Sequence, residues 1–161
     1  MKRWKSKFER PLKRWNKAAN EADAKILQEF GLRRKKEIWK AKAIVRNFRR
    51  LAREVVASKD ETKEAILLEK LKKLGLLGEK GNVDDVLALT IQDILNRRLQ
   101  TVVFRKGLAK SMKQSRQMIV HGRIAIGGKR SKWPSSLVAI LEEPQINMYK
   151  MEVVKNEPAK A

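Results

Sequence analysis

The basic and amide side chains between residues 97 and 132 are the groups whose types and spacing could do chemistry. Lys and Arg attract phosphate by charge, and each cation that touches a phosphate releases condensed counterions. Their segment reads as helix, turn, helix and a glycine-turned hairpin, which would present the charge on a small rigid wedge. The candidate polyanion-binding residues here are Arg97, Arg98, Gln100, Lys106, Lys110, Lys113, Arg116, Gln117, His121, Arg123, Lys129, Arg130 and Lys132.

A second group of cations opens and lines a helix predicted from about residue 33 to residue 57. Apolar residues recur there at helical spacing and form one stripe: Ile38, Ala41, Val45, Phe48, Ala52 and Val55. A neighbouring basic stripe supplies further candidate contacts. This second group of candidates is Arg33, Arg34, Lys35, Lys36, Lys42, Arg46, Arg49, Arg50 and Arg53.

The composition indicates what kind of partner such a surface would bind. The 161 residues include 39 Lys and Arg against 18 Asp and Glu, so the formal net charge is +21. That field concentrates phosphates and favours nucleic acid, although an anionic membrane surface would also attract it. A hydrophobic content of 42% is enough for a core. No signal peptide and no apolar run of about 20 residues is visible, so we expect a cytoplasmic protein without a membrane partner.

Catalytic and metal-binding chemistry has little support. His121 is the only histidine and the chain has no cysteine, so a disulfide framework, a thiolate metal site and most nucleophilic dyads are excluded. Adjacent Asp84 and Asp85 are better explained by helix-start electrostatics. The spacing of Gly122 and Gly127 resembles a phosphate-binding loop, but the required Gly-Lys-Ser/Thr sequence is missing. We therefore expect no enzyme, no metal and no cofactor.

The helical stretch after the long helix is marked by caps. A turn is predicted at residues 58–60 and a helix at about 63–74, which Gly75 would close. Asn82 and Thr90 are good N-caps, and acidic residues follow each of them within three positions. From Thr90 the apolar pattern predicts one helix over about 91–103.

The remaining elements are a helix, a hairpin and two more strands. The helix is predicted at 110–121, and the Gly-Gly pair at 127 and 128 is a favoured two-residue hairpin turn. The predicted strand segments are 124–126, 138–140 and 146–149. We expect apolar residues to pack inward here, which would leave outside Arg98, Gln100, Lys106, Lys110, Lys113, Arg116, Gln117 and His121.

These elements predict an α+β fold with four parts. Residues 1–30 would form a basic arm, partly extended; 31–96 a helical RNA-binding domain; 97–150 a small helix-turn-helix and β-hairpin domain; and 151–161 a frayed tail. Trp4 and Trp15 could order only on binding or could pack back onto the helical domain, and the sequence leaves both open.

RNA is favoured over DNA because the charge is spread over the arm, the long helix and the hairpin. That spread suits a folded RNA with converging backbones, and Trp or Arg beside Lys can stack on splayed bases. A single charge run would more simply be a solvated helix face, but all of them together would not.

Two motifs carry a resemblance to a known family. The segment from Arg98-Leu99-Gln100 to Ile126 resembles the α-L RNA-binding module, which also occurs in pseudouridine synthases and some tRNA synthetases. Upstream, the sequence GLRRKKEIWK at 31–40 resembles the archaeal and eukaryotic branch of the fourth small-subunit ribosomal protein family. The family's zinc knuckle, found in many bacterial members, is absent here, and Gly127 replaces the usual Asn of the hairpin.

The resemblance implies a primary binder of small-subunit rRNA. Family members dock on a five-way junction of the 5′ domain and help nucleate assembly. They contact the fifth small-subunit protein and lie near the path by which mRNA enters, with an influence on translational accuracy. The alternatives are an RNA-modifying or tRNA-handling factor that uses the same module, or a free-standing DNA-binding protein.

Overall fold

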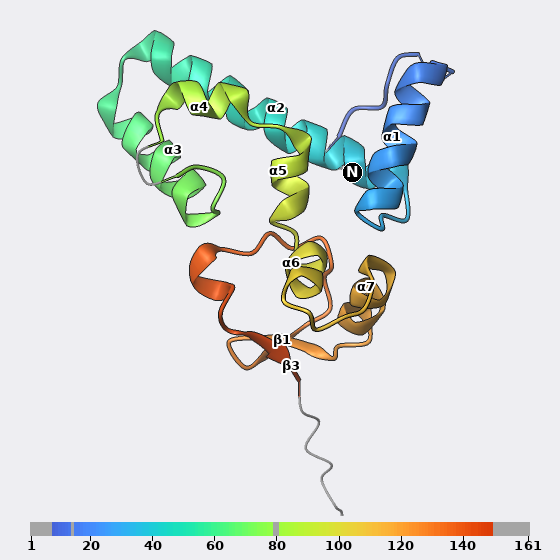
Figure 1. Cartoon of the computed structure of the whole chain (residues 1–161). Helices are drawn as coiled ribbons and strands as arrows, with labels where there is room; N and C mark the ends of the chain where they lie inside the picture. Colours follow the sequence, from blue (N-terminus) through green and yellow to red (C-terminus); the bar gives the residue numbers. More distant parts are fainter. Residues whose placement is uncertain (1–7, 14, 79–80, 150–161) are drawn as a thin grey trace, which may run out of the picture.

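The protein combines helices with one small sheet, as the sequence predicts. The computed structural model describes residues 8–13, 15–78 and 81–149. Figure 1 shows α1 to α4 in the upper part of the molecule with α2 running across it, α5 leading downward, and α6, α7 and the sheet below. We call residues 17–96 the helical region and residues 97–149 the C-terminal region. The fold class is α+β.

Helix α2 (Lys35–Ser58) is the backbone of the helical region. Its buried residues are those of the predicted stripe, Ile38, Ala41, Val45, Phe48, Ala52 and Val55. They lie on one face because they recur every three or four positions along a 3.6-residue turn. The helix ends at Lys59, whose left-handed backbone (φ 53°) closes the last turn. The predicted stripe and turn are confirmed.

Three shorter helices pack against α2 and complete this core. Helix α3 (Glu61–Lys73) buries Leu67 and Leu71, and Gly75 follows it with a φ of 67°. Helices α4 (Val83–Ala88) and α5 (Ile91–Asn96) begin with capping boxes at Asn82 and Thr90. A capping box satisfies two helix-start N–H groups that would otherwise lack partners. Both predicted N-caps are confirmed.

The single helix predicted over 91–103 is wrong, because the chain breaks at Arg97 and Arg98. Helix α5 ends at Asn96 and α6 (Leu99–Arg105) begins after Arg98, whose backbone is extended (φ −72°, ψ 143°). The segment 134–138 causes the break. The Leu99 N–H donates to the Ser136 carbonyl at 2.8 Å, and the Val138 N–H donates to the Arg97 carbonyl at 2.9 Å. These bonds are non-local, so periodicity alone could not reveal them.

The C-terminal region closes on a three-stranded antiparallel sheet. After α7 (Met112–Val120) come β1 (Ile124–Ile126), β2 (Lys129–Ser131) and β3 (Ile146–Met148), in the order β2-β1-β3. The register places Ala125 opposite Arg130 and Asn147.

The predicted strand at 138–140 is wrong. Its last residue begins the 3₁₀ helix η1 (Ile140–Glu142), and Leu137 forms only an isolated bridge with Arg98. Val138 is fully buried in the core, so its apolar character reflects packing rather than strand pairing.

The N-terminal arm predicted over 1–30 is wrong for its second half, where helix α1 (Lys17–Glu29) forms. Asn16 caps it, its side chain accepting from the Ala19 N–H at 3.3 Å. Asp23 is buried against α2 and pairs with Lys42 at 2.9 Å. Trp15 is 94% exposed and so does not pack back. Trp4 and the predicted tail at 151–161 lie outside the described residues.

The buried apolar residues form two clusters that follow the chain order. One is drawn from Phe30 to Leu95 and the other from Leu99 to Ile146. Partly buried Met112 and Leu137 of the C-terminal region pack against the first cluster. The helical region and the C-terminal region thus each have a core of their own, joined at α5 and α6.

The core of the helical region predicts a large loss of stability for Phe48→Ala. Phe48 is buried on α2, and truncating a buried Phe costs about 3–5 kcal/mol. Urea unfolding followed by circular dichroism measures the free energy of unfolding. Val56→Ala, on the exposed face of the same helix, should change that free energy by no more than about 0.5 kcal/mol. Equal losses for the two variants would contradict this assignment of the core.

Candidate nucleic-acid interface

Most of the candidate side chains in the C-terminal region lie on its surface. The exposed candidates are Lys110, Lys113, Gln117, His121, Arg123, Lys129, Arg130 and Lys132. No Asp or Glu occurs anywhere in residues 94–141 of the sequence. The surface of this segment therefore carries positive charge that its own residues do not neutralise, and such a surface attracts phosphate.

The start of α7 places two of these cations on either side of a capped helix end. Ser111 caps the helix and accepts from the Gln114 N–H at 3.2 Å. The Gln114 side chain accepts from the Lys110 N–H at 2.8 Å. Because these bonds fix the backbone, Lys110 and Lys113 project from a rigid base.

The hairpin holds Arg130 in a defined position. Gly127 (φ 55°) and Gly128 (φ 78°) both adopt the positive φ that a two-residue turn of this kind needs. The Arg130 guanidinium carbon lies 4.8 Å from the centre of the Tyr149 ring. A Cβ on Gly122 would lie 2.7 Å from Arg130 Cδ, so this glycine leaves room for the arginine stem. The guanidinium is pre-positioned at the surface rather than freely mobile.

Three candidates predicted to lie outside are instead internal, and for them the predicted exposure is wrong. Arg98 is 5% exposed, Gln100 is 1% exposed and Arg116 is half-buried. Arg98 and Arg116 both bind Glu37, near the start of α2, and Gln100 joins them through its Oε1 atom, which lies 3.5 Å from Arg116 Nη1. We call Glu37, Arg98, Gln100 and Arg116 the Glu37 cluster.

Glu37 accepts hydrogen bonds from both arginines of the cluster. The Arg98 Nη2 donates to Glu37 Oε2 at 2.7 Å. Arg116 binds in a fork, with Nη1 on Oε2 and Nη2 on Oε1, both at 3.0 Å. A bidentate arginine–carboxylate pair fixes geometry as well as charge. The cluster thereby fastens α2 to α6 and α7.

Gln100 completes the junction between the helical region and the C-terminal region. Its Nε2 atom lies within hydrogen-bond distance of three carbonyls, those of Phe30 (3.3 Å), Gly31 (3.1 Å) and Met112 (2.9 Å). Ser115 donates to the Gln100 carbonyl at 2.7 Å. A buried amide with partners on two regions sets their relative position.

The charges of the cluster shift two pKa values. Burial opposes ionisation of Glu37, but the hydrogen bonds and charges of Arg116 and Arg98 outweigh it, so the pKa of Glu37 lies below its ordinary value. Burial lowers the pKa of Arg98, and Glu37 opposes that shift. Glu37 is consequently a carboxylate at neutral pH, and the pair of arginines is partly neutralised inside the protein.

Two further candidates in the C-terminal region also have internal partners. The partly buried Arg97 binds Glu143 at 2.9 Å and the Val138 carbonyl at 3.0 Å. Lys106 is also predicted to lie outside, but it is half-buried and donates to the Ile146 carbonyl at 3.4 Å, so its predicted exposure is wrong as well. Both side chains support the fold of the region.

The basic stripe on α2 is largely occupied by contacts within the chain. Lys35 donates to Asn20 at 2.8 Å and Lys42 to Asp23 at 2.9 Å, both on α1. Arg49 donates to the Leu89 carbonyl at 2.7 Å. Four other candidates are exposed, namely Arg33, Arg34, Lys36 and Arg53, and Arg53 donates to the Arg49 carbonyl at 3.3 Å.

The two remaining arginines of α2 are exposed and pair with carboxylates. Arg46 contacts Glu9 of the N-terminal segment, and Arg50 contacts Glu54 one turn along α2. Exposed pairs of this kind contribute little to stability.

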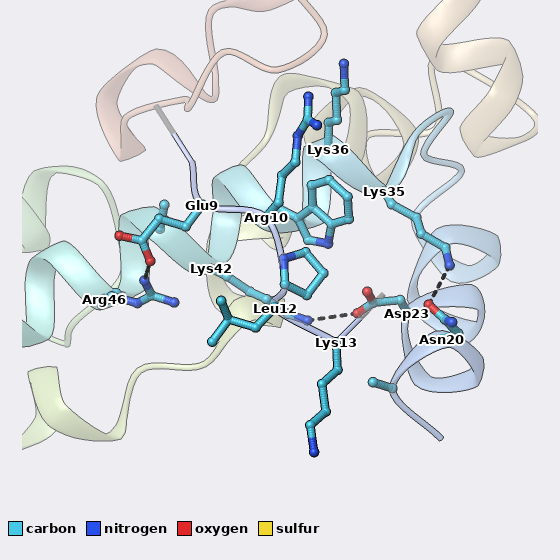
Figure 2. A pocket seen from close by; sticks show the side chains of 14 residues that line it. Glu9, Arg10, Leu12, Lys13, Asn20, Asp23, Lys35, Lys36, Lys42 and Arg46 are labelled. Carbon is cyan, nitrogen blue, oxygen red and sulfur yellow. Dashed lines mark hydrogen bonds and ion pairs between the residues drawn. The ribbon is translucent and has the colours of Figure 1, made fainter. Parts of the chain in front are cut away.

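A groove lies between the N-terminal segment, α1 and α2. Figure 2 shows Lys35 and Lys42 pointing toward α1, with Arg46 facing Glu9. The groove has a volume of about 630 Å³ and Trp39 lines it. The Trp39 ring lies 5.9 Å from that of Phe8. Sequence reasoning missed this groove because α1 itself was not predicted.

Glu37 is the positioning residue that sequence reasoning missed most clearly. It is the only carboxylate in residues 30–53 and directly follows four cationic residues in the sequence. A lone acid within such a run is a recognisable signal of an internal ion pair. Within residues 8–13, 15–78 and 81–149, no cluster of His, Asp and Glu could hold a metal ion. In those same ranges no helix is long and apolar enough to cross a bilayer.

Comparison with known proteins gives consistent matches. A family model described as the S4 domain matches residues 97–140. A protein of Metallosphaera sedula named small ribosomal subunit protein uS4 is 44% identical over 96% of this chain and 88% of its own length. A protein of the same name from Methanosphaerula palustris is 45% identical over 88% of this chain and 83% of its own length. Another from Saccharolobus islandicus is 43% identical over 98% of this chain and 89% of its own length.

The Glu37 cluster predicts a pH-dependent contribution to stability. At neutral pH, Glu37→Gln should lower the free energy of unfolding by roughly 1.5–3 kcal/mol, because it removes the charge that both arginines bind. The pKa of Glu37 is lower in the folded chain, so the contribution is present above the unfolded pKa of about 4.3. It is lost as the pH falls through the lower native pKa.

Urea unfolding of the wild type and the variant at several pH values between 7 and 2 measures this difference. Glu54→Gln removes an exposed pair on the same helix and should change stability by no more than about 0.5 kcal/mol. A difference between wild type and Glu37→Gln that persists undiminished in acid would show that the charge of Glu37 contributes nothing.

Proposed function

Because this chain belongs to the uS4 family of small ribosomal subunit proteins, we propose that it is a structural component of the small subunit and binds folded rRNA. Relatives with that name match nearly the whole chain, which is the observation that carries the proposal. The exposed cations on an acid-free stretch supply the chemistry, because they would neutralise phosphates of a compact RNA. The role is one of binding and positioning, without a catalytic step.

The proposed interface consists of the exposed cations and omits the Glu37 cluster. On the C-terminal region it includes Lys110 and Lys113 at the start of α7 and the basic residues of the hairpin. On the helical region it includes the exposed residues that precede and open α2, Arg33, Arg34 and Lys36. Arg98, Gln100 and Arg116 would act indirectly, by holding these two sets of cations in one relative orientation.

The finer parts of the role follow from the family resemblance. We propose binding at a five-way junction of the rRNA 5′ domain, where the protein would help to nucleate subunit assembly. Its neighbours would be the fifth small-subunit protein and mRNA near the path by which it enters, with an influence on translational accuracy. The alternative of an RNA-modifying or tRNA-handling factor gains no support from the three relatives named above.

Footprinting tests the proposed function directly. Small-subunit rRNA is probed chemically with and without the full chain, and we expect protection confined to one junction. Co-sedimentation with purified small subunits is the companion measurement. Protection scattered evenly along the RNA, or absence of the protein from the subunits of its source organism, would contradict the proposal.

Charge removal at the start of α7 should weaken rRNA binding and its salt dependence. In the double variant Lys110→Ala, Lys113→Ala two phosphate contacts are lost, so the slope of log affinity against log salt should fall by about 1.4–1.8. Filter binding at several salt concentrations measures it. Lys73→Ala, an exposed cation on α3, should leave the slope unchanged. An unchanged slope for the double variant, with native circular dichroism, would remove both lysines from the interface.

A further inference from the structure

Trp133 is an exposed aromatic residue at the basic hairpin that the cation-based prediction of the interface did not include. It follows β2 directly after Lys132 and is 74% exposed. Tryptophan is highly buried on average in folded proteins, and exposed indoles are enriched where a partner will cover them. The position of Trp133 therefore indicates a binding contact.

The backbone beneath Trp133 is firmly held. Ser136 N–H donates to the Trp133 carbonyl at 3.1 Å, which closes a turn around Pro134. The Pro134 carbonyl accepts from the Gln100 N–H at 3.4 Å, and the Ser136 carbonyl accepts from the Leu99 N–H at 2.8 Å. These bonds attach the turn to the first residues of α6. Only the side-chain torsions of the indole would need to be ordered on binding, so the entropic penalty is small.

The surroundings of Trp133 select the kind of partner. Lys129, Arg130 and Lys132 are exposed just before it, and no carboxylate occurs in residues 94–141. A protein partner would need an acidic face as well as an apolar pocket for the indole. RNA offers phosphate charge and the flat face of a base within one nucleotide. The combination of an exposed indole with neighbouring cations therefore favours RNA.

We propose that Trp133 stacks on an unpaired nucleobase of the small-subunit rRNA while neighbouring cations bind phosphates of the rRNA backbone. The proposal rests on the proposed function, which supplies the RNA. Bases in loops and bulges can swing out of a helix and stack on aromatic side chains, whereas paired bases cannot. Stacking of this kind is tolerant of base identity, so the site would require an unpaired position rather than a particular base.

Substitution of Trp133 tests the proposal through affinity and salt dependence together. Using the full chain and a transcript of the rRNA 5′ domain, we expect Trp133→Ala to weaken binding roughly 5- to 150-fold, the range for loss of one base stack. The salt slope should stay that of the wild type, because stacking neutralises no phosphate. Trp133→Phe should retain most of the affinity. Leu141→Ala, at a 77% exposed apolar residue on η1, should have no effect.

Fluorescence provides a second measurement that does not depend on the alanine variant folding. In a variant with Trp4, Trp15 and Trp39 replaced by Phe, we expect the emission of Trp133 to be quenched when the transcript is added. Three results would each overturn the proposal: wild-type affinity for Trp133→Ala, a reduced salt slope for that variant, or unquenched emission of Trp133. Contact of Trp133 with a neighbouring ribosomal protein in whole subunits would not rescue the proposal after any of these results. If the wild type itself fails to bind the transcript, the proposed function fails instead.

Discussion

The ion pair of Glu37 with Arg98 and Arg116 is the constraint on which the arrangement of this protein depends. The C-terminal region needs buried arginines at its junction with α2, yet residues 94–141 supply no carboxylate to neutralise them. The helical region provides the missing charge from a single residue. A buried charge without a partner would be strongly destabilising. The negative charge of Glu37 is thus kept inside the junction, and the outer surface formed by residues 94–141 carries no acidic side chain.

This separation of inner and outer charge divides the basic residues into two classes. Arg97, Arg98 and Arg116 have partners within the chain and hold elements together, whereas Lys110, Lys113 and the hairpin cations are exposed. The same division holds at α2, where Lys35 and Lys42 face α1 and are paired, whereas Arg33, Arg34 and Lys36 are exposed. Rigid placement of the exposed class matters because RNA is recognised through the fixed spacing of its phosphates. Net charge alone would give only nonspecific attraction.

Local signals in the sequence predicted much of the fold, and non-local contacts account for the errors. The α2 stripe, the caps at Asn82 and Thr90 and the Gly-Gly hairpin depend on neighbouring residues, and all are present. The break at residues 97 and 98 depends on hydrogen bonds to a segment about forty residues away. The burial of Arg98 and Gln100 depends on Glu37, Phe30 and Gly31, and residue type alone predicts exposure for such side chains.

The chain order of the two apolar clusters has a consequence for synthesis on the ribosome. Every buried member of the first cluster lies between residues 30 and 95, so this core can close before later residues leave the exit tunnel. Glu37 stays solvated by water until Arg98 and Arg116 emerge, because these partners are 61 and 79 positions further along the chain. Folding during synthesis can therefore begin with the first cluster, and the docking of Met112, Leu137 and the two arginines against the helical region comes later. Closing a long loop costs entropy, which favours late formation of contacts with such high sequence separation.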